Sequence, residues 1–116
     1  MRRVRVVRDG SGVSVGSRVA VADRWWQRLR GLLARPPLTG GEGLLLLGCN
    51  SVHTIGMTHA IDVAFLDGDG RVVRSISALR PFRVGLGGRG AIHTLELPAG
   101  RLDETGTVPG DRLDWS

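Results

Sequence analysis

Turn-forming glycines divide this sequence into short segments, and that division constrains the fold more than any other feature. The chain has 116 residues, of which 18 are glycine, and no repeat period accompanies them. Glycine favours tight turns, so many glycines without a repeat predict many short strands. Strands at this spacing are typical of a sandwich or barrel. We therefore expect a mainly β chain: a small, distorted antiparallel β-sandwich or jelly-roll-like barrel.

One segment in the N-terminal half has helical spacing instead. Asp23 is a suitable helix N-cap, and the segment ends at Pro36 and Pro37. Its apolar residues follow at i, i+4, i+7 and i+8, and they are Trp25, Leu29, Leu32 and Leu33. This spacing makes one apolar stripe. We predict one α-helix here, packed near the open end of the β structure.

The other segments are predicted to be strands separated by turns. The expected strands are 2–8, 13–21, 44–47, 60–66, 71–77, 91–97 and 112–115. Residues 67–70, with the sequence DGDG, indicate a hairpin turn. A single helical turn is expected within 101–107, and the glycine-rich segment 81–90 is expected to be an irregular loop.

Size and charge narrow the expected class. A chain of this length fits one domain, which we expect to be 1–116. The net charge is +5, and the 16 basic residues are all arginines, scattered apart from a cluster in 2–8. No set of aromatic residues suited to base stacking accompanies them, so nucleic acid is a disfavoured partner. The single cysteine excludes an intrachain disulfide.

The hydropathy pattern bears on location. The basic N-terminus is not followed by an apolar region, so no signal peptide is expected. The longest apolar runs, such as 44–47, are too short for a membrane segment. We expect a soluble, cytoplasmic protein, monomeric or weakly dimeric, with an unknown small ligand or protein partner.

Asp62 lies in the phase of Ala64 and Leu66 within an otherwise apolar predicted strand. A buried carboxylate needs partners, because an unpaired charge in the core is costly. Two interpretations stay open. Asp62 accepts hydrogen bonds from the preceding loop or pairs with Arg28, or it is a ligand-facing carboxylate or general base.

Glu96 is the second acidic residue within a predicted strand. It shares one face of 91–97 with Ile92 and Thr94, whereas His93 lies on the other face. The two side chains therefore cannot act together unless a bulge intervenes. Glu96 is the better site candidate, and His93 is favoured as a surface residue or a satisfied core residue.

The histidines and the cysteine match no established site pattern. Cys49 and His53 lie four residues apart, which by itself does not define a nucleophilic pair. The residues available to a metal ion are Cys49, His53, His59, Asp62, His93 and Glu96. They show no CxxC, HxH or HExxH spacing. We expect no metal site and no cofactor.

Seven segments, in this order, carry a resemblance to a known family. They are 28–33 (RLRGLL), 43–46 (GLLL), 51–57 (SVHTIGM), 61–67 (IDVAFLD), 70–73 (GRVV), 95–100 (LELPAG) and 109–113 (PGDRL). Together they resemble the domain-of-unknown-function 192 family over about 19–113. The resemblance implies a mostly β domain of sandwich or jelly-roll type, found in bacteria and archaea, without an established activity. Many members carry a Trp-Met-Lys-Asn-Thr type segment where this chain has 53–57, so it is similar to a His-containing variant.

These observations leave three classes of function. A non-enzymatic binding or accessory module for a small ligand, sugar or peptide is favoured, because no complete catalytic motif is present. A hydrolase-type enzyme would use Asp62 or Glu96 with His53. A protein-interaction module would use the helix that carries Trp25 and Trp26.

The candidate polar site combines four residues. We expect His53, Asp62 and Glu96, with Arg28 nearby, to line one shared patch. The expectation rests on two properties: the family segments contain these residues, and each is polar within sequence that otherwise forms a core.

Overall fold

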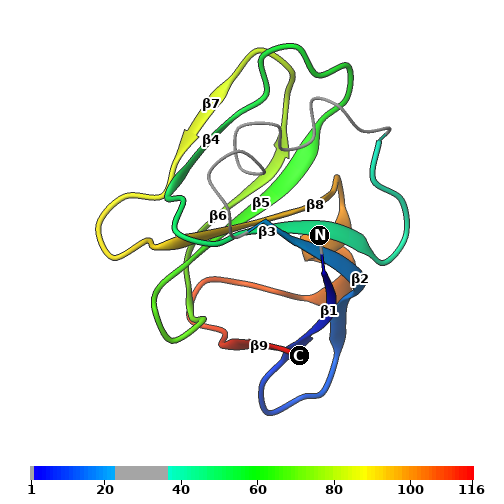
Figure 1. Cartoon of the computed structure of the whole chain (residues 1–116), viewed down its shortest axis with the longest axis vertical. Coiled ribbons are helices and arrows are strands. Elements are labelled where there is room, and N and C mark those ends of the chain that lie inside the picture. The colour runs from blue at the N-terminus through cyan, green and yellow to red at the C-terminus, as the bar shows by residue number, and fades with distance from the viewer. Residues whose placement is uncertain (1, 23–36) are drawn as a thin grey trace.

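The computed structural model describes residues 2–22 and 37–116, which form a mainly β structure with one short helix (Figure 1). In chain order the described elements are β1 (Arg3–Arg8), β2 (Ser14–Ala22), β3 (Glu42–Leu46), β4 (Ser51–His53), β5 (Ile61–Leu66), β6 (Val72–Leu79), β7 (Val84–Leu86), β8 (His93–Pro98), α2 (Arg101–Thr105) and β9 (Leu113–Trp115). The predicted mainly β class is confirmed. The described helix is neither long nor apolar enough to cross a membrane.

Seven of the described strands form one mixed sheet in the order β6-β5-β8-β3-β2-β1-β9. The β2–β3 pair is parallel, and the other neighbours are antiparallel. This pair corrects the expectation of a wholly antiparallel architecture. The physical reason is the long connection through 23–41, because parallel neighbours need a crossover of about a dozen residues or more.

The sheet curls until its two edges meet at one corner. Arg71, before β6, bridges to Arg112, before β9, and the N–H of Leu113 donates to the carbonyl of Gly70 over 2.9 Å. Gly70 permits this approach: its φ is +85°, and a Cβ there would lie 2.5 Å from the carbonyl oxygen of Leu113. Over the described residues the sheet therefore approaches a barrel without closing into one.

Apolar residues are buried on both faces of the curled sheet. The inner face includes Val6, Val19, Leu45, Ala64, Leu66, Leu95 and Leu97, and Leu102 of α2 packs with them. The outer face of the central strands includes Leu44, Leu46, Ile61, Val63 and Phe65. β5 is buried along its whole length. A strand buried on both faces has no need of alternating polarity, which explains its nearly continuous apolar sequence.

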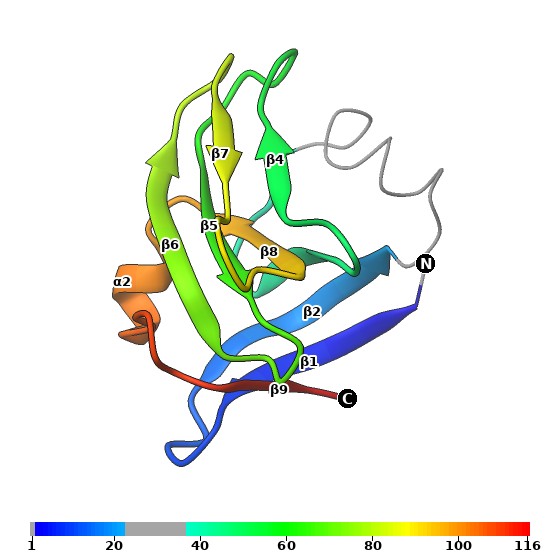
Figure 2. The ribbon, with the colours of Figure 1, turned by 90° about the vertical axis from the view of Figure 1, so that its left-hand side faces the viewer.

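A second sheet, of β4 and β7, packs on the outer face, and Figure 2 shows the pair beside β5 and β6. Gly85 of β7 allows close packing, since a Cβ there would lie 3.0 Å from Cδ1 of Ile76. The sequence predicts a loop over 81–90 and no strand at 51–53, and both predictions are wrong. Strands of three residues are too short to show an alternating pattern.

The other predicted elements agree with the structure to within one or two residues. The hairpin turn is confirmed, because Oδ1 of Asp67 accepts the N–H groups of Asp69 and Arg71, each over 2.9 Å. The helical turn expected within 101–107 is α2. The predicted N-terminal-half helix, with Asp23, lies outside the described residues.

Candidate functional site

Asp62 is fully buried in β5, and backbone amides occupy both of its carboxylate oxygens. Oδ1 accepts the N–H of Ala78 over 2.8 Å, and Oδ2 accepts the N–H of Leu102 over 2.9 Å. Ala78 has φ +53° at a bulge in β6, and Leu102 lies in the first turn of α2. Asp62 is thus an acceptor of backbone N–H groups, as one interpretation expected. Its donors come from β6 and α2, not from the preceding loop.

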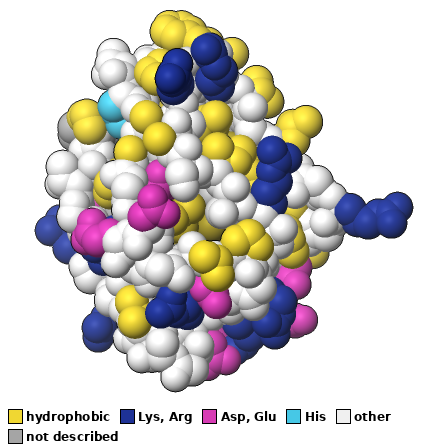
Figure 3. Space-filling view, turned by 180° about the vertical axis from the view of Figure 1, so that it is seen from behind, with side chains coloured by type: hydrophobic (Ala, Val, Ile, Leu, Met, Phe, Trp, Pro, Cys, Tyr) yellow, Lys and Arg dark blue, Asp and Glu magenta, His cyan; other side chains and the backbone are white. Residues whose placement is uncertain are grey.

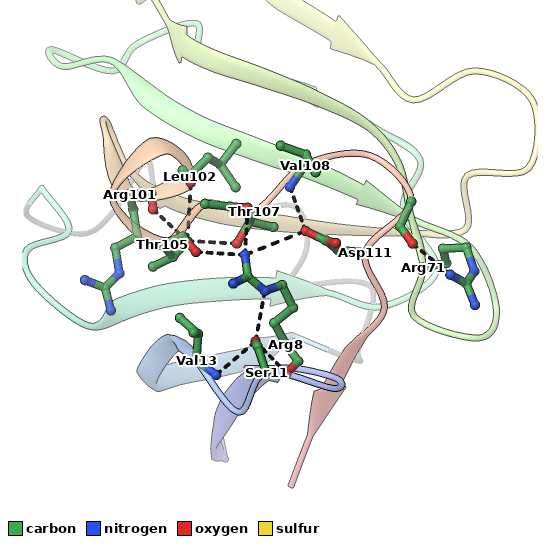
Figure 4. A network of polar contacts seen from close by, with 12 residues as sticks. Arg8, Ser11, Val13, Arg71, Arg101, Leu102, Thr105, Thr107, Val108 and Asp111 are labelled. Carbon is green, nitrogen blue, oxygen red and sulfur yellow. Dashed lines mark hydrogen bonds and ion pairs between the residues drawn. The ribbon is translucent and has the colours of Figure 1, made fainter.

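Arg8 holds α2 at the other end. Its Nη1 donates to the carbonyls of Thr105 (2.9 Å) and Gly106 (2.6 Å), and its Nε donates to Oγ of Ser11 over 3.0 Å. Figure 4 shows this guanidinium between the β1–β2 turn and the segment that follows α2. A cation at the last carbonyls of a helix and an anion at its first amides are both favourable. Arg8 and Asp62 together fix α2 across the open end of the curled sheet.

Glu96 lies on the opposite face of the sheet from Asp62. In the β5–β8 register Glu96 pairs with Val63, and Asp62 pairs with Leu97. Because side chains alternate along a strand, the two carboxyl groups point to opposite faces. The sequence predicts one shared patch, and for this pair that prediction is wrong.

The surroundings of Glu96 are apolar. Its neighbours across β3 and β5 are Leu44 and Val63, both in the outer-face core. The residue is 4% exposed, and Oε2 has no hydrogen-bond partner among the described residues. Burial raises the pKa of Glu96 to about 8. At neutral pH, Glu96 is therefore an uncharged carboxylic acid in most molecules. This form offers one hydrogen-bond donor and free acceptor capacity.

His59 supplies two further buried polar atoms without a partner in the described structure. Both ring nitrogens are buried and lack a hydrogen-bond partner within the described part of the chain. His59 lies two residues before Ile61, which pairs with Pro98, two residues beyond Glu96. His59 and Glu96 therefore lie toward the same end of the β5–β8 pair. From the sequence, His59 is only one of several available metal ligands, because nothing in its pattern shows that the ring nitrogens are buried.

His53 does not share the buried setting of Glu96. His53 is exposed on β4, in register with Val84 of β7. Arg28 lies outside the described residues. Over 2–22 and 37–116, no three histidine, cysteine or carboxylate side chains are placed to hold a metal ion.

His93 has structural contacts of its own. Its Nδ1 accepts the N–H of Gly48 over 3.0 Å, and its ring meets Trp115 edge to face with centroids 6.1 Å apart. Burial lowers the pKa of His93. The predicted separation from Glu96 is confirmed, since His93 pairs with Leu66 of the inner-face core.

A shallow hollow of about 290 Å³ lies beside β9. Its lining residues are Gly68, Asp69, Arg112, Leu113, Asp114 and Trp115. Arg112 is already neutralised there by Asp114 (3.1 Å) and Asp9 (3.2 Å). Because its charges satisfy one another, this hollow is a weaker candidate than the face around Glu96.

The fold and these buried groups define a small, mainly β protein with a curled seven-stranded sheet and a buried acid on its outer face. A family model for domain of unknown function 192, described as "Uncharacterized ACR, COG1430", matches residues 5–115. The chain belongs to this family, and the resemblance found in its sequence segments is confirmed.

Curated relatives carry names that state no activity. The UPF0127 protein of Thermococcus sibiricus is 33% identical over 102 residues, which cover 84% of this chain and 66% of that protein. A UPF0127 protein of Pyrococcus furiosus is 33% identical over 108 residues, which cover 90% of this chain and 92% of that protein.

Two solved structures share the fold. A protein of Sinorhizobium meliloti, described as a proposed transcription regulator, has a TM-score of 0.83 at 26% identity and covers 97% of this chain and 92% of its own. A protein of unknown function from Novosphingobium aromaticivorans has a TM-score of 0.82 at 22% identity, covering 97% and 84%. The second likeness concerns the fold alone.

Proposed function

We propose that this protein is a non-enzymatic binding or accessory module, and that it binds a small ligand, sugar or peptide at the face carrying Glu96. One observation carries the proposal: Oε2 of this buried carboxyl has no hydrogen-bond partner among the described residues. Nearly all buried polar groups in folded proteins are paired, so an unpaired one indicates a partner such as a ligand, an ion or a water molecule. The buried ring nitrogens of His59 support the same interpretation.

The chemistry of the acid narrows the ligand class. An uncharged carboxylic acid donates to a carbonyl or hydroxyl oxygen and accepts from an amide or hydroxyl group. Leu44 and Val63 flank Glu96 and are fully buried, so a ligand that reaches the acid enters apolar surroundings. A sugar hydroxyl with its ring face, or a peptide group with an apolar side chain, meets both requirements.

The positions of Asp62 and His53, two of the predicted catalytic residues, favour binding over hydrolysis. Both oxygens of Asp62 already accept backbone N–H groups, so this carboxylate is not free to act as a base. His53 is exposed on β4, which belongs to the second sheet and not to the strand pair that carries both acids. The interaction alternative involves Trp25 and Trp26, which lie outside the described residues.

The proposed setting of the module is a single domain spanning 1–116. We propose a cytoplasmic protein, monomeric or weakly dimeric, whose partner is a small ligand or protein and not nucleic acid. The support comes from composition. A net charge of +5 does not by itself require a polyanionic partner, and no set of aromatic residues suited to base stacking accompanies the arginines.

A thermal-unfolding screen tests the proposal. Wild-type protein and Glu96→Gln are each screened against sugars, short peptides and neutral metabolites at pH 7. Glu104→Gln is the matched control, because Glu104 is exposed and its ion pair with Arg101 lies at the surface. A compound that raises the midpoint of the wild type and of Glu104→Gln, but not that of Glu96→Gln, places the ligand at the buried acid. Equal shifts in all three proteins contradict the proposal.

A further inference from the structure

Two long segments of the chain contain no acidic residues. Segments 43–61 and 70–95 contain neither aspartate nor glutamate. Segment 70–95 contains five arginines, namely Arg71, Arg74, Arg80, Arg83 and Arg89. In Figure 3, the top carries arginine and hydrophobic side chains without acidic ones, whereas the lower part carries arginine and acidic side chains together. The chain therefore has a basic, apolar end and an end where acidic groups are interspersed.

Four large hydrophobic side chains are exposed on β7 and on the loops that follow β4 and precede β7. Ile55, Phe82, Val84 and Leu86 are 53%, 65%, 61% and 59% exposed. Val84 and Leu86 alternate on β7 with Gly85, which faces the main sheet, so both lie on its outer side. We call these four residues, with Arg80 and Arg83, the basic apolar tip. Exposed apolar side chains that gather on one surface mark sites of interaction with a protein or a membrane.

The tip is built by buried contacts of Thr54, which has no exposed surface. Its carbonyl accepts the N–H of Phe82 over 3.0 Å, and its Oγ1 accepts the N–H of Arg83 over 2.9 Å. The same Oγ1 donates to the carbonyl of Arg80. These bonds join the loop that precedes β7 to the residue that follows β4.

Phe82 is held in a conformation that large side chains rarely adopt. Its φ is +61°, in the left-handed region. Such backbone strain persists only when the surroundings impose it, and it concentrates at binding sites. Here the contacts to Thr54 impose it, and the result is an exposed aromatic ring displayed at the head of a loop.

We propose that the basic apolar tip docks onto an anionic lipid surface. Large apolar side chains enter the boundary between headgroups and acyl chains, and nearby arginines pair with anionic headgroups. Figure 2 shows the loop after β4 and the loop before β7 together at the top of the molecule. Projecting loop heads suit insertion into a bilayer, whereas an acidic peptide would need a groove. This docking is independent of the ligand proposed at Glu96.

Vesicle flotation tests the docking. The intact protein is mixed with vesicles of phosphatidylcholine alone, or with about 30% phosphatidylserine added. We expect binding to the anionic vesicles only, and weaker binding at high salt. Phe82→Asn removes the inserted ring but keeps a residue that tolerates positive φ, and we expect about tenfold weaker binding. The double variant Arg80→Gln, Arg83→Gln should also lose roughly tenfold.

Val108→Ser is the matched control, because Val108 is 54% exposed but lies near Asp111. It should bind anionic vesicles as the wild type does, and the circular dichroism of every variant should match the wild type. The docking is refuted if wild-type protein binds both vesicle types equally or neither. It is also refuted if Phe82→Asn binds unchanged, or if soluble polyglutamate binds the tip while anionic vesicles do not.

Discussion

The pH dependence of stability is the sharpest consequence of burying Glu96. Its ordinary pKa is 4.5, and burial raises it to about 8 in the folded protein. Below pH 4.5 the carboxyl is protonated in both the folded and the unfolded chain, so the folded state carries no penalty. Between pH 4.5 and about 8, unfolding releases a proton, and the free energy of unfolding falls by about 1.4 kcal/mol per pH unit. Above that range the whole penalty, roughly 5 kcal/mol, is present.

Chemical denaturation across pH measures this effect. The free energies of unfolding of wild type and Glu96→Gln are determined from pH 4 to pH 9, and their difference is plotted. Glutamine does not ionise, so the difference should move by several kcal/mol in favour of the variant as the pH rises. Glu104→Gln, which changes an exposed carboxylate in the same way, should follow the wild type to within about 0.5 kcal/mol.

A specific result would refute the reasoning. If the curves for wild type and Glu96→Gln run parallel from pH 5 to pH 8, the carboxyl has the same proton affinity in the folded and unfolded states. Glu96 would then be ionised and satisfied in the folded protein. The argument for an unsatisfied acid, and with it the proposed ligand site, would fail.

Three further perturbations separate structural roles. Asp62→Asn should lower the free energy of unfolding by about 1.5–3 kcal/mol, because one backbone N–H would face an amide donor. Urea denaturation measures this loss, with the exposed Asp103→Asn as the control. Equal effects of the two substitutions would contradict the anchoring role of Asp62. Gly70→Ala should lower the free energy of unfolding by more than about 1–2 kcal/mol, because of its positive φ and the close carbonyl. Gly68→Ala, in the same turn, should lower it less. Thermal melting curves of the two variants measure the difference. The lowered pKa of His93 means that the unfolded chain binds the proton more readily, so the free energy of unfolding should fall as the pH drops below 6.5. In a His93→Gln variant this decrease should be smaller. An unchanged decrease at acid pH would contradict the prediction.

Much of the fold could be predicted from local sequence chemistry. The turn at 67–70 has the residues its geometry needs, and the strands beside it have enough length to show a pattern. β4 and β7 could not be predicted, since each has three residues and depends on packing over Gly85. The parallel β2–β3 pair also escaped prediction, because strand order depends on contacts between distant segments.

The candidate site was predictable in its residue types but not in its arrangement. Asp62 and Glu96 stand out as acids in apolar strands, and the sequence correctly places His93 on the other face from Glu96. Which face of the sheet each acid meets depends on the register between β5 and β8. A change of one residue in that register would put both acids on the same face. The burial of His59 depends on tertiary packing in the same way.

Asp62 and Glu96 lie on opposite faces of one sheet and have different roles, one in stability and one in the proposed recognition of a ligand. On the inner face, the end of the curled sheet is covered by α2, whose backbone N–H at Leu102 needs an acceptor, and Asp62 supplies it. On the outer face, Glu96 meets aliphatic side chains, and the described structure gives its Oε2 no partner. An acid that is satisfied by its own fold stabilises that fold, whereas an acid left unsatisfied lowers stability until something binds. Substitution of Asp62 should therefore lower stability with or without ligand. Substitution of Glu96 by glutamine should raise stability at neutral pH and remove the response to ligand, and this opposite pair of outcomes distinguishes an anchor from a binding group.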